Sequence, residues 1–320
     1  MGENRRGPLL PRDRGPLSAA TAGTLRGTCA PPGAAAVSRA DPYGDDLQLA
    51  LYTCYELHYR GFDGVDPGWE WAPALLTVRA ALEGRFLTAL RRDAGAGQPL
   101  DALLADLLVE PVDGCGVAEF LEARGTLEHL RAYAQQRSLY HLKEADPHAW
   151  VLPRLSGRAK AGMAAVEYDE FGGGRANRVH ARLFADLMSD LGLETGYGHY
   201  LDTGCAEMLA LVNAMSLFGL HRRLRGALVG HFATVEITSS PASRRLARAM
   251  ERTGAGPSAA RFYNEHVEAD AVHEQIVRRD VIGGLLGDEP ELEPDIAFGV
   301  CATSYLEDRL GARLLASWDG

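Results

Sequence analysis

The stretch that says most about this chain runs from residue 262 to residue 273 and reads FYNEHVEADAVH. Each residue of an α-helix turns the side chain by about 100°, so His266, Asp270 and His273 fall within a sector about 60° wide. Two imidazoles and one carboxylate on one face suit a divalent transition metal, iron above all. The alternative is a solvated helix face that carries two ordinary histidines. The spacing by itself favours a metal-binding helix.

The bulk composition is that of an ordinary globular protein. The chain has 320 residues, of which 46% are hydrophobic and 24% charged, and this length can hold one large domain or two small ones. The net charge of −10 argues against nucleic acid or an anionic membrane as a partner. No apolar run approaches the roughly 18 residues that a membrane-spanning helix needs.

The cysteines indicate a reducing environment. There are five, at positions 29, 54, 115, 205 and 301, and no two of them form a C-x-x-C pair. An odd, scattered set argues against a zinc ribbon or a disulfide framework. We therefore expect a cytoplasmic protein.

The first 42 residues differ from the rest of the chain. Residues 1–42 are rich in Arg, Pro, Gly and Ala and contain no aromatic residue and no sustained apolar period. They also lack the apolar stretch of about 7–15 residues that a secretory signal needs. The composition predicts a disordered leader.

From Asp45 onward the apolar residues recur three and four positions apart, which is typical of α-helices. The predicted helices span 47–59, 71–90, 100–108, 117–143, 150–170, 178–191, 205–239, 241–252, 259–285 and 294–317. No convincing hairpin or alternating strand pattern is present. The chain is therefore expected to be all-α, with residues 43–115 as an N-terminal helical extension packed on a core domain of residues 116–320.

Glu236 is a second candidate ligand. Its neighbours in GHFATVEIT are apolar or small, so its carboxylate is expected to be buried. A buried carboxylate is costly unless it is paired or bound to a metal. The competing interpretation is a salt bridge to Arg222, Arg223 or Arg225.

His180 and Glu170 extend the candidate site. His180 begins an amphipathic helix, where a lone histidine is more often a packing residue than a ligand. Glu170 precedes Gly172–Gly174, and glycines let the backbone leave the regular helix, so that Glu170 can approach His180. A continuous helix would leave the two about 80° apart. Glu167, one turn earlier, is the substitute for Glu170.

Better-known catalytic motifs are missing. HEQIV at 273–277 has Val277 where a zincin needs its second histidine, and no Glu-x-x-His of the ferritin-like di-iron type occurs. The glycine run lacks the lysine of a phosphate-binding loop, and no G-x-S-x-G motif is present.

Taken together, these residues resemble the heme-oxygenase-like di-iron oxidase and oxygenase superfamily, and within it the branch of iron-containing redox enzymes. The resemblance covers about residues 115–318. It rests on five stretches, namely KEADPH at 143–148, EFGGG at 170–174, His180 with Leu183 and Phe184, Glu236 with Ser239 and Ser240, and the helix from His266 to His273.

The resemblance implies a heme-oxygenase-like helical bundle that holds two Fe(2+) ions per chain, or alternatively one, without heme, and uses O2 as co-substrate. It also implies the ligand set, which comprises Glu170, His180, Glu236, His266, Asp270 and His273. The substrate would be a small molecule derived from an amino acid or a fatty acid, in specialised metabolism. Glu144, His141 and His148 are expected to lie outside the site.

Two other functions stay open at this point. One is a metal-free heme-oxygenase-like protein that binds a small molecule, with His266 and His273 lining its pocket. The other is a helical partner-binding protein whose carboxylates form salt bridges. The use of an external electron donor and a homodimeric state also stay open.

Overall fold

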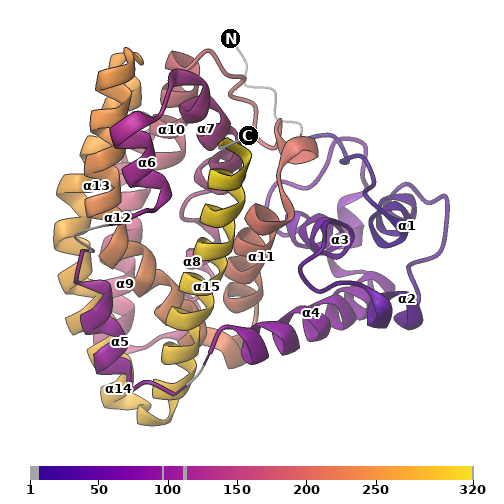
Figure 1. The fold of residues 1–320 in the computed structure, drawn as a ribbon. Coiled ribbons are helices and arrows are strands. Elements are labelled where there is room, and N and C mark those ends of the chain that lie inside the picture. The colour runs from indigo at the N-terminus through magenta and orange to yellow at the C-terminus, as the bar shows by residue number, and fades with distance from the viewer. Residues whose placement is uncertain (1–6, 96, 111–113, 319–320) are drawn as a thin grey trace.

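The computed structural model describes residues 7–95, 97–110 and 114–318, and within these ranges it contains helices and no strands (Figure 1). The α-helices are α1 (Pro16–Leu25), α2 (Ala34–Arg39), α3 (Asp45–Glu56), α4 (Pro73–Asp93), α5 (Leu100–Leu107), α6 (Val117–Arg124), α7 (Leu127–His141), α8 (Asp146–Ala149), α9 (Gly157–Glu170), α10 (His180–Asp190), α11 (Ala206–Leu220), α12 (Arg225–Thr253), α13 (Pro257–Ile276), α14 (Gly283–Asp288) and α15 (Glu293–Trp318). Short 3-10 turns cover Pro67–Trp71, Leu152–Arg154, Gly172–Gly174, Ala176–Arg178, Leu201–Thr203, Arg222–Leu224 and Pro290–Leu292, and Val277–Ile282 is a π-helical turn. The prediction of an all-α protein is confirmed.

Helix α12 is the centre of the bundle and packs against α13 on one side and α15 on another. Its close approach to α15 depends on two glycines. A Cβ atom at Gly230 would overlap the carbonyl oxygen of Ile296, and one at Gly299 would overlap that of Ala227. Glycine therefore lets the two backbones touch, which fixes α12 and the side chains that it presents to α13.

The N-terminal segment corrects one expectation. The predicted disorder of residues 1–42 is wrong for residues 7–42, whereas residues 1–6 lie outside the described part of the chain. Leu17 and Leu25 of α1 are buried. The backbone N–H groups of Leu17 and Ser18 donate to the carboxylate of Asp46 at 2.9 and 2.7 Å, which satisfies the start of α1. The alanine-rich, low-polarity segment gains its order by docking on α3.

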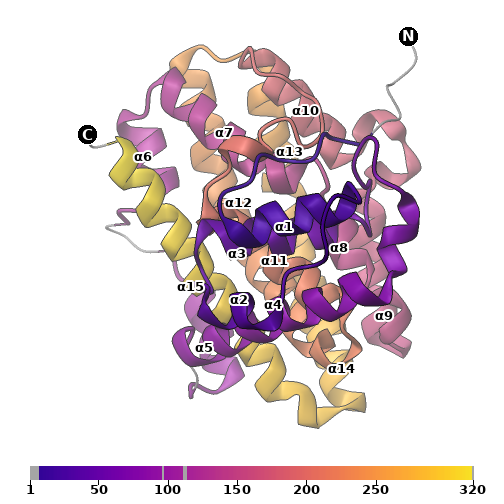
Figure 2. The same ribbon diagram turned by 90° about the vertical axis from the view of Figure 1, so that its right-hand side faces the viewer.

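Helices α1 to α4 form a group on one side of the bundle (Figure 2). Helix α3 lies between α1 and α11, which explains why every residue from Leu47 to Glu56 is buried. Helix α5, by contrast, contacts α12 and α15 of the bundle itself. The division of the chain at residues 115 and 116 stays a prediction.

Several helix boundaries differ from the predicted ones. The segment expected as one helix over 205–239 is α11 and α12, separated at Arg222–Leu224. Pro241 lies inside α12 and does not end it. Proline removes one backbone hydrogen bond, and packing against α13 and α15 holds the helix across that gap. Among the described helices, none is both long and apolar enough to cross a membrane.

Candidate metal centre

The predicted ligands converge inside the bundle from four helices. Glu170 ends α9, His180 begins α10, Glu236 lies in the middle of α12, and α13 carries the other three. All six side chains are buried, with exposed fractions of 7% or less. On α13, His266, Asp270 and His273 share the buried face whereas Val272 is 58% exposed, as the helical spacing predicts.

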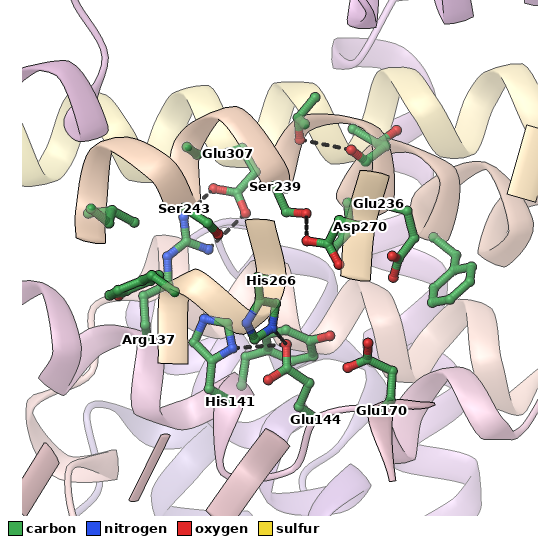
Figure 3. Close-up of a pocket in the computed structure, with 18 of the residues that line it drawn as sticks. Arg137, His141, Glu144, Glu170, Glu236, Ser239, Ser243, His266, Asp270 and Glu307 are labelled. Atoms are coloured by element: carbon green, nitrogen blue, oxygen red, sulfur yellow. Dashed lines mark hydrogen bonds and ion pairs between the residues drawn. The ribbon is translucent and has the colours of Figure 1, made fainter. Parts of the chain in front are cut away.

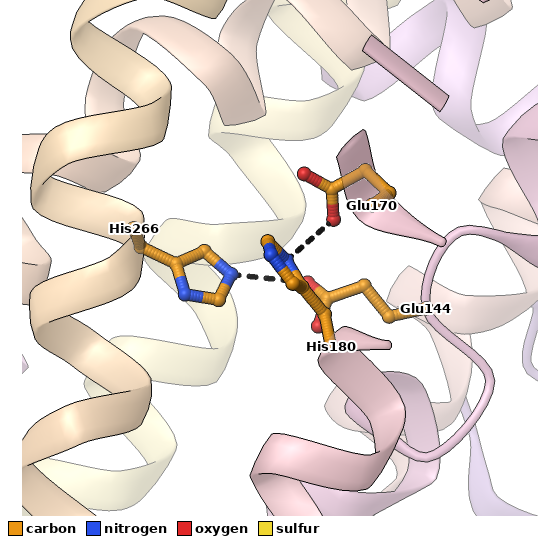
Figure 4. Close-up of side chains that lie close together, drawn as sticks. All are labelled: Glu144, Glu170, His180 and His266. Atoms are coloured by element: carbon orange, nitrogen blue, oxygen red, sulfur yellow. Dashed lines mark ion pairs between the residues drawn. The ribbon is translucent and has the colours of Figure 1, made fainter. Parts of the chain in front are cut away.

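A first group of possible ligand atoms brings together Glu144, Glu170, His180 and His266, all within 4.8 Å of one another (Figure 4). Glu170 Oε2 lies 2.8 Å from His180 Nδ1, and Glu144 Oε1 lies 3.8 Å from His266 Nε2. The two imidazole rings have their centroids 4.5 Å apart. Two carboxylates and two imidazoles therefore surround one point.

A second group consists of Glu170, Glu236 and His273. Nδ1 of His273 lies 3.1 Å from Glu236 Oε2 and 3.7 Å from Glu170 Oε1. Glu170 belongs to both groups, so its two oxygens can face two neighbouring cations. Of the alternative partners for Glu236, Arg225 pairs with Glu289, and Arg222 and Arg223 are exposed whereas Glu236 is buried.

Asp270 lies beside the second group and is not one of its members. Its Oδ1 is 3.6 Å from His273 Nδ1, and its Oδ2 accepts a hydrogen bond from the hydroxyl of Ser239 (Figure 3). The hydrogen bond from Ser239 thus holds the Asp270 carboxylate at the edge of the second group.

The glycine run between α9 and α10 explains how Glu170 reaches His180. Gly172, Gly173 and Gly174 have φ values of 74°, 60° and 76°, a region that other residues seldom adopt. A Cβ at Gly172 would also press against the backbone of Arg178 and Val179. The glycines therefore fold the chain back on itself, and the predicted approach of Glu170 to His180 is present.

Glu144 is the member of the first group that was not among the predicted ligands. It was expected outside the site, yet it lies in the first group, in the turn between α7 and α8. Nδ1 of His141 lies 3.0 Å from its Oε1. The sequence feature that could have indicated Glu144 as a ligand is its position between two histidines, His141 and His148. Glu167, the substitute for Glu170, is buried but belongs to neither group.

The electrostatics show that the centre requires positive charge. Burial raises the pKa of Glu236 to about 8, and the nearby carboxylates of Asp270 and Glu170 add to this. Burial alone would lower the pKa of His266, but Glu144 overcomes that effect and raises it to about 10. For His273 burial is likewise outweighed, by Asp270 and Glu236, and its pKa rises to about 11. A set of buried carboxylates that holds protons so firmly would also attract a metal cation.

The hydrogen bonding of the histidines tests whether a metal fits. Nδ1 of His266 donates to the carbonyl oxygen of Phe262 at 2.8 Å, so its Nε2 carries the lone pair in the neutral ring. That Nε2 has no hydrogen-bond partner among the described residues, and neither has Glu144 Oε2. Nδ1 of His180 is near Glu170 but outside hydrogen-bonding geometry. Lone pairs that converge on one point without bonding to each other fit a metal ion.

A cavity of about 280 Å³ adjoins these groups (Figure 3). Glu170, Glu236 and Asp270 line one end of it, and Arg137 and Glu307 line the opposite end. A small molecule in this cavity can therefore reach the ligand groups directly.

Comparison with known proteins agrees with this geometry. The profile of a family described as iron-containing redox enzymes matches residues 131–308, more than half of the chain. The chain belongs to this family. A search of curated proteins found no match. The region matched by the family includes every member of both ligand groups, from Glu144 to His273. The chain is therefore an iron-containing redox enzyme by family, and its buried glutamates and histidines could bind the metal.

Proposed function

We propose that the protein is a non-heme iron oxidoreductase that uses O2 to oxidise a small molecule. The observation that carries the proposal is the sharing of Glu170 between two groups of buried ligands. A carboxylate with one oxygen near each group is the arrangement that a pair of adjacent cations requires. A heme, whose porphyrin supplies four nitrogens to its iron, has no need for so many carboxylates.

Each ligand group would hold one ion. Glu144, Glu170, His180 and His266 would hold the first, and Glu170, Glu236 and His273 the second, with Asp270 beside it. Iron bound there supplies redox chemistry and open coordination positions for O2. The first set is the more complete one, so we expect the first ion to bind more tightly.

Other residues orient the ligands. Asp169 Oδ2 lies 3.3 Å from His273 Nε2, on the side of the ring away from Glu236. A carboxylate on one ring nitrogen fixes the tautomer that leaves the other nitrogen free for a metal. Two further contacts position the carboxylates: Nδ1 of His141 lies 3.0 Å from Glu144, and the hydroxyl of Ser239 donates a hydrogen bond to Asp270.

Aromatic side chains form an apolar wall on one side of the centre. Phe184 and Phe262 are fully buried and their rings pack edge to face, with centroids 5.1 Å apart, next to the rings of His141 and His266. A dry pocket protects reactive species from side reactions. All five cysteines are free thiols, which supports the proposed cytoplasmic setting.

The proposal is tested by loading the protein with Fe(II) without oxygen and then adding O2. We expect a transient visible absorption band in the native protein and in His199→Ala, an exposed histidine remote from the ligand groups. His266→Ala should show none. A protein that takes up no iron would favour the metal-free, small-molecule-binding alternative.

A further inference from the structure

The wall of the cavity contains one of two buried histidines that are bonded to each other. His148 of α8 was expected outside the site, yet it lines the cavity, as do Phe232 and Glu144. Nε2 of His148 lies 3.1 Å from Nε2 of His231 on α12, which is not part of the cavity lining. Both histidines are 1% exposed. His148 therefore has the cavity on one side of its ring and His231 on another.

The surroundings of His231 determine which ring nitrogens carry hydrogen. The hydroxyl of Thr303 donates to the carbonyl oxygen of Gly299 at 2.8 Å, so its oxygen accepts the hydrogen bond from Nδ1 of His231, also at 2.8 Å. A neutral imidazole has a single N–H, so Nε2 of His231 carries a lone pair and accepts a hydrogen bond from Nε2 of His148. Nδ1 of His148 is therefore left with a lone pair.

Burial keeps both rings neutral. It lowers the pKa of His231 to about 4, and the more distant carboxylate of Glu307 only partly opposes this effect. Burial, with His231 adding to it, also lowers the pKa of His148 well below its usual value, against the opposing carboxylate of Glu144. Each histidine thus has one N–H at neutral pH, and the hydrogen bonds from His148 to Thr303 keep one direction.

Nδ1 of His148 is an acceptor that the described residues leave unused. It makes no hydrogen bond with them and, unlike Nε2 of His266, it is open to the cavity. The ring of Phe232 packs edge to face on that of His148, with centroids 5.0 Å apart. An acceptor in such apolar surroundings is costly unless a bound molecule supplies a donor.

We propose that His148 sets the orientation and specificity of substrate binding by accepting, at Nδ1, a hydrogen bond from an N–H or O–H group of the substrate. Thr303 and His231 are positioning residues that impose this polarity on His148. The inference rests on the proposed function, because Glu144 and Glu170 line the same cavity. A molecule bonded to His148 is thus held in the space that adjoins both ligand groups.

Thr303 controls the polarity because it supplies the acceptor for Nδ1 of His231. Without its hydroxyl, an N–H at that nitrogen would be buried and unpaired, which costs more than an unpaired lone pair. His231 would then carry its hydrogen on Nε2 and donate to Nε2 of His148, and the hydrogen of His148 would be on Nδ1. Thr303→Val, which is close in shape, should therefore convert the acceptor in the cavity wall into a donor.

Nitrogen-15 NMR of the His148 ring tests this polarity, because it distinguishes a ring nitrogen with hydrogen from one with a lone pair. It is measured on the full chain, metal-free and loaded with diamagnetic Zn(II). We expect hydrogen on Nε2 in the native protein and in Thr303→Ser, and on Nδ1 in Thr303→Val. Thr53→Val is the matched control, since Thr53 is also 2% exposed and bonds to the carbonyl oxygen of Leu49, outside the cavity. Hydrogen on Nδ1 of His148 in the native protein overturns the proposal.

Two probes of nearly the same shape test the specificity. Indole has one N–H donor, and indene has none. In calorimetric titrations without oxygen, the native protein, metal-free or loaded with Fe(II), should bind indole about fivefold more tightly than indene. The preference should persist in Thr53→Val and be lost in His148→Phe and in Thr303→Val. Equal binding of the two probes by the native protein, binding of neither, or an unchanged preference in Thr303→Val overturns the proposal.

Both measurements can be made without iron, which separates this inference from the proposed function. The expected tautomer and probe preference in a protein that takes up no iron would leave the inference standing and contradict the proposed function. Iron uptake by a protein in which Nδ1 of His148 carries hydrogen would do the reverse.

Discussion

Oε2 of Glu170 lies 2.8 Å from Nδ1 of His180, although the two residues belong to different helices, α9 and α10. The three glycines between α9 and α10 make this contact possible, because all three have positive φ. The other oxygen of Glu170 is within 3.7 Å of His273. One carboxylate thus joins the two histidine groups, and the proposed chemistry depends on it.

Glu167 provides a test of whether Glu170 has been assigned correctly. Both of its oxygens lack a hydrogen-bond partner among the described residues, and burial, with Glu170 and Glu236 adding to it, raises its pKa well above the usual value. A raised carboxyl pKa contributes stability below the unfolded pKa that is lost as the pH rises through the folded pKa. Glu167→Gln should therefore increase the free energy of unfolding at pH 7 and retain all bound iron. Chemical denaturation and iron analysis check both, and loss of iron would show that Glu167 is a ligand.

The N-terminal helix should matter for stability. Leu17 of α1 is 2% exposed, and truncation of a buried leucine typically costs about 2–5 kcal/mol. Leu17→Ala should therefore lower the free energy of unfolding by about 3 kcal/mol. Leu9→Ala, at a leucine that is 76% exposed, is the control and should change it by less than about 0.5 kcal/mol. If Leu17→Ala and Leu9→Ala change the free energy of unfolding equally in urea denaturation, α1 does not dock on the bundle.

A buried lysine connects the N-terminal helices to Glu144. Nζ of Lys143 lies 2.5 Å from Glu56 Oε2 and over the rings of Tyr52 and Tyr59, at 4.6 and 4.5 Å from their centroids. Removing one partner of a buried ion pair costs about 3–5 kcal/mol, because the other charge stays buried. Lys143→Met should therefore lower the free energy of unfolding by that amount and weaken iron binding through the adjacent Glu144.

The double variant Lys143→Met/Glu56→Gln is the control for this prediction. It removes both charges, so it should recover most of the stability that the single variant loses. If the two variants are equally unstable in urea denaturation, the ion pair is not the cause.

Buried His231 should lower the free energy of unfolding at acidic pH. Its Nε2 lies 3.1 Å from His148 Nε2 and its Nδ1 lies 2.8 Å from Thr303 Oγ1, and burial lowers its pKa to about 4. Since the unfolded histidine has a pKa of about 6.5, the unfolded state binds an extra proton between these values, and stability falls as the pH drops from 6.5 to 4. We expect His231 to contribute a loss on the order of 3 kcal/mol over this range, and His148, whose pKa burial and His231 also lower, to add to it. His231→Asn should show a correspondingly flatter pH dependence in urea denaturation, and an unchanged slope would contradict the assignment.

Features that depend on neighbouring residues could be predicted from the sequence, whereas features that depend on residues distant in the sequence could not. The positions of His266, Asp270 and His273 follow from helix periodicity alone, and the glycines after Glu170 are a local signal for a reversal of the chain. Glu144 and Lys143 depend on side chains far away in the sequence, such as His266 and Glu56, which no local pattern reveals. The order of α1 likewise depends on Asp46 and on the surface of α3.

The most direct test of the paired ligand groups is the amount of Fe(II) bound per chain under anaerobic conditions. The native protein should bind a pair of ions with different affinities. His266→Ala should lose the ion of the first group, His273→Ala should lose the ion of the second, and Glu170→Ala should lose at least one together with nearly all O2 reactivity. Iron binding that is undiminished in all three variants, or absent from the native protein, would contradict the account.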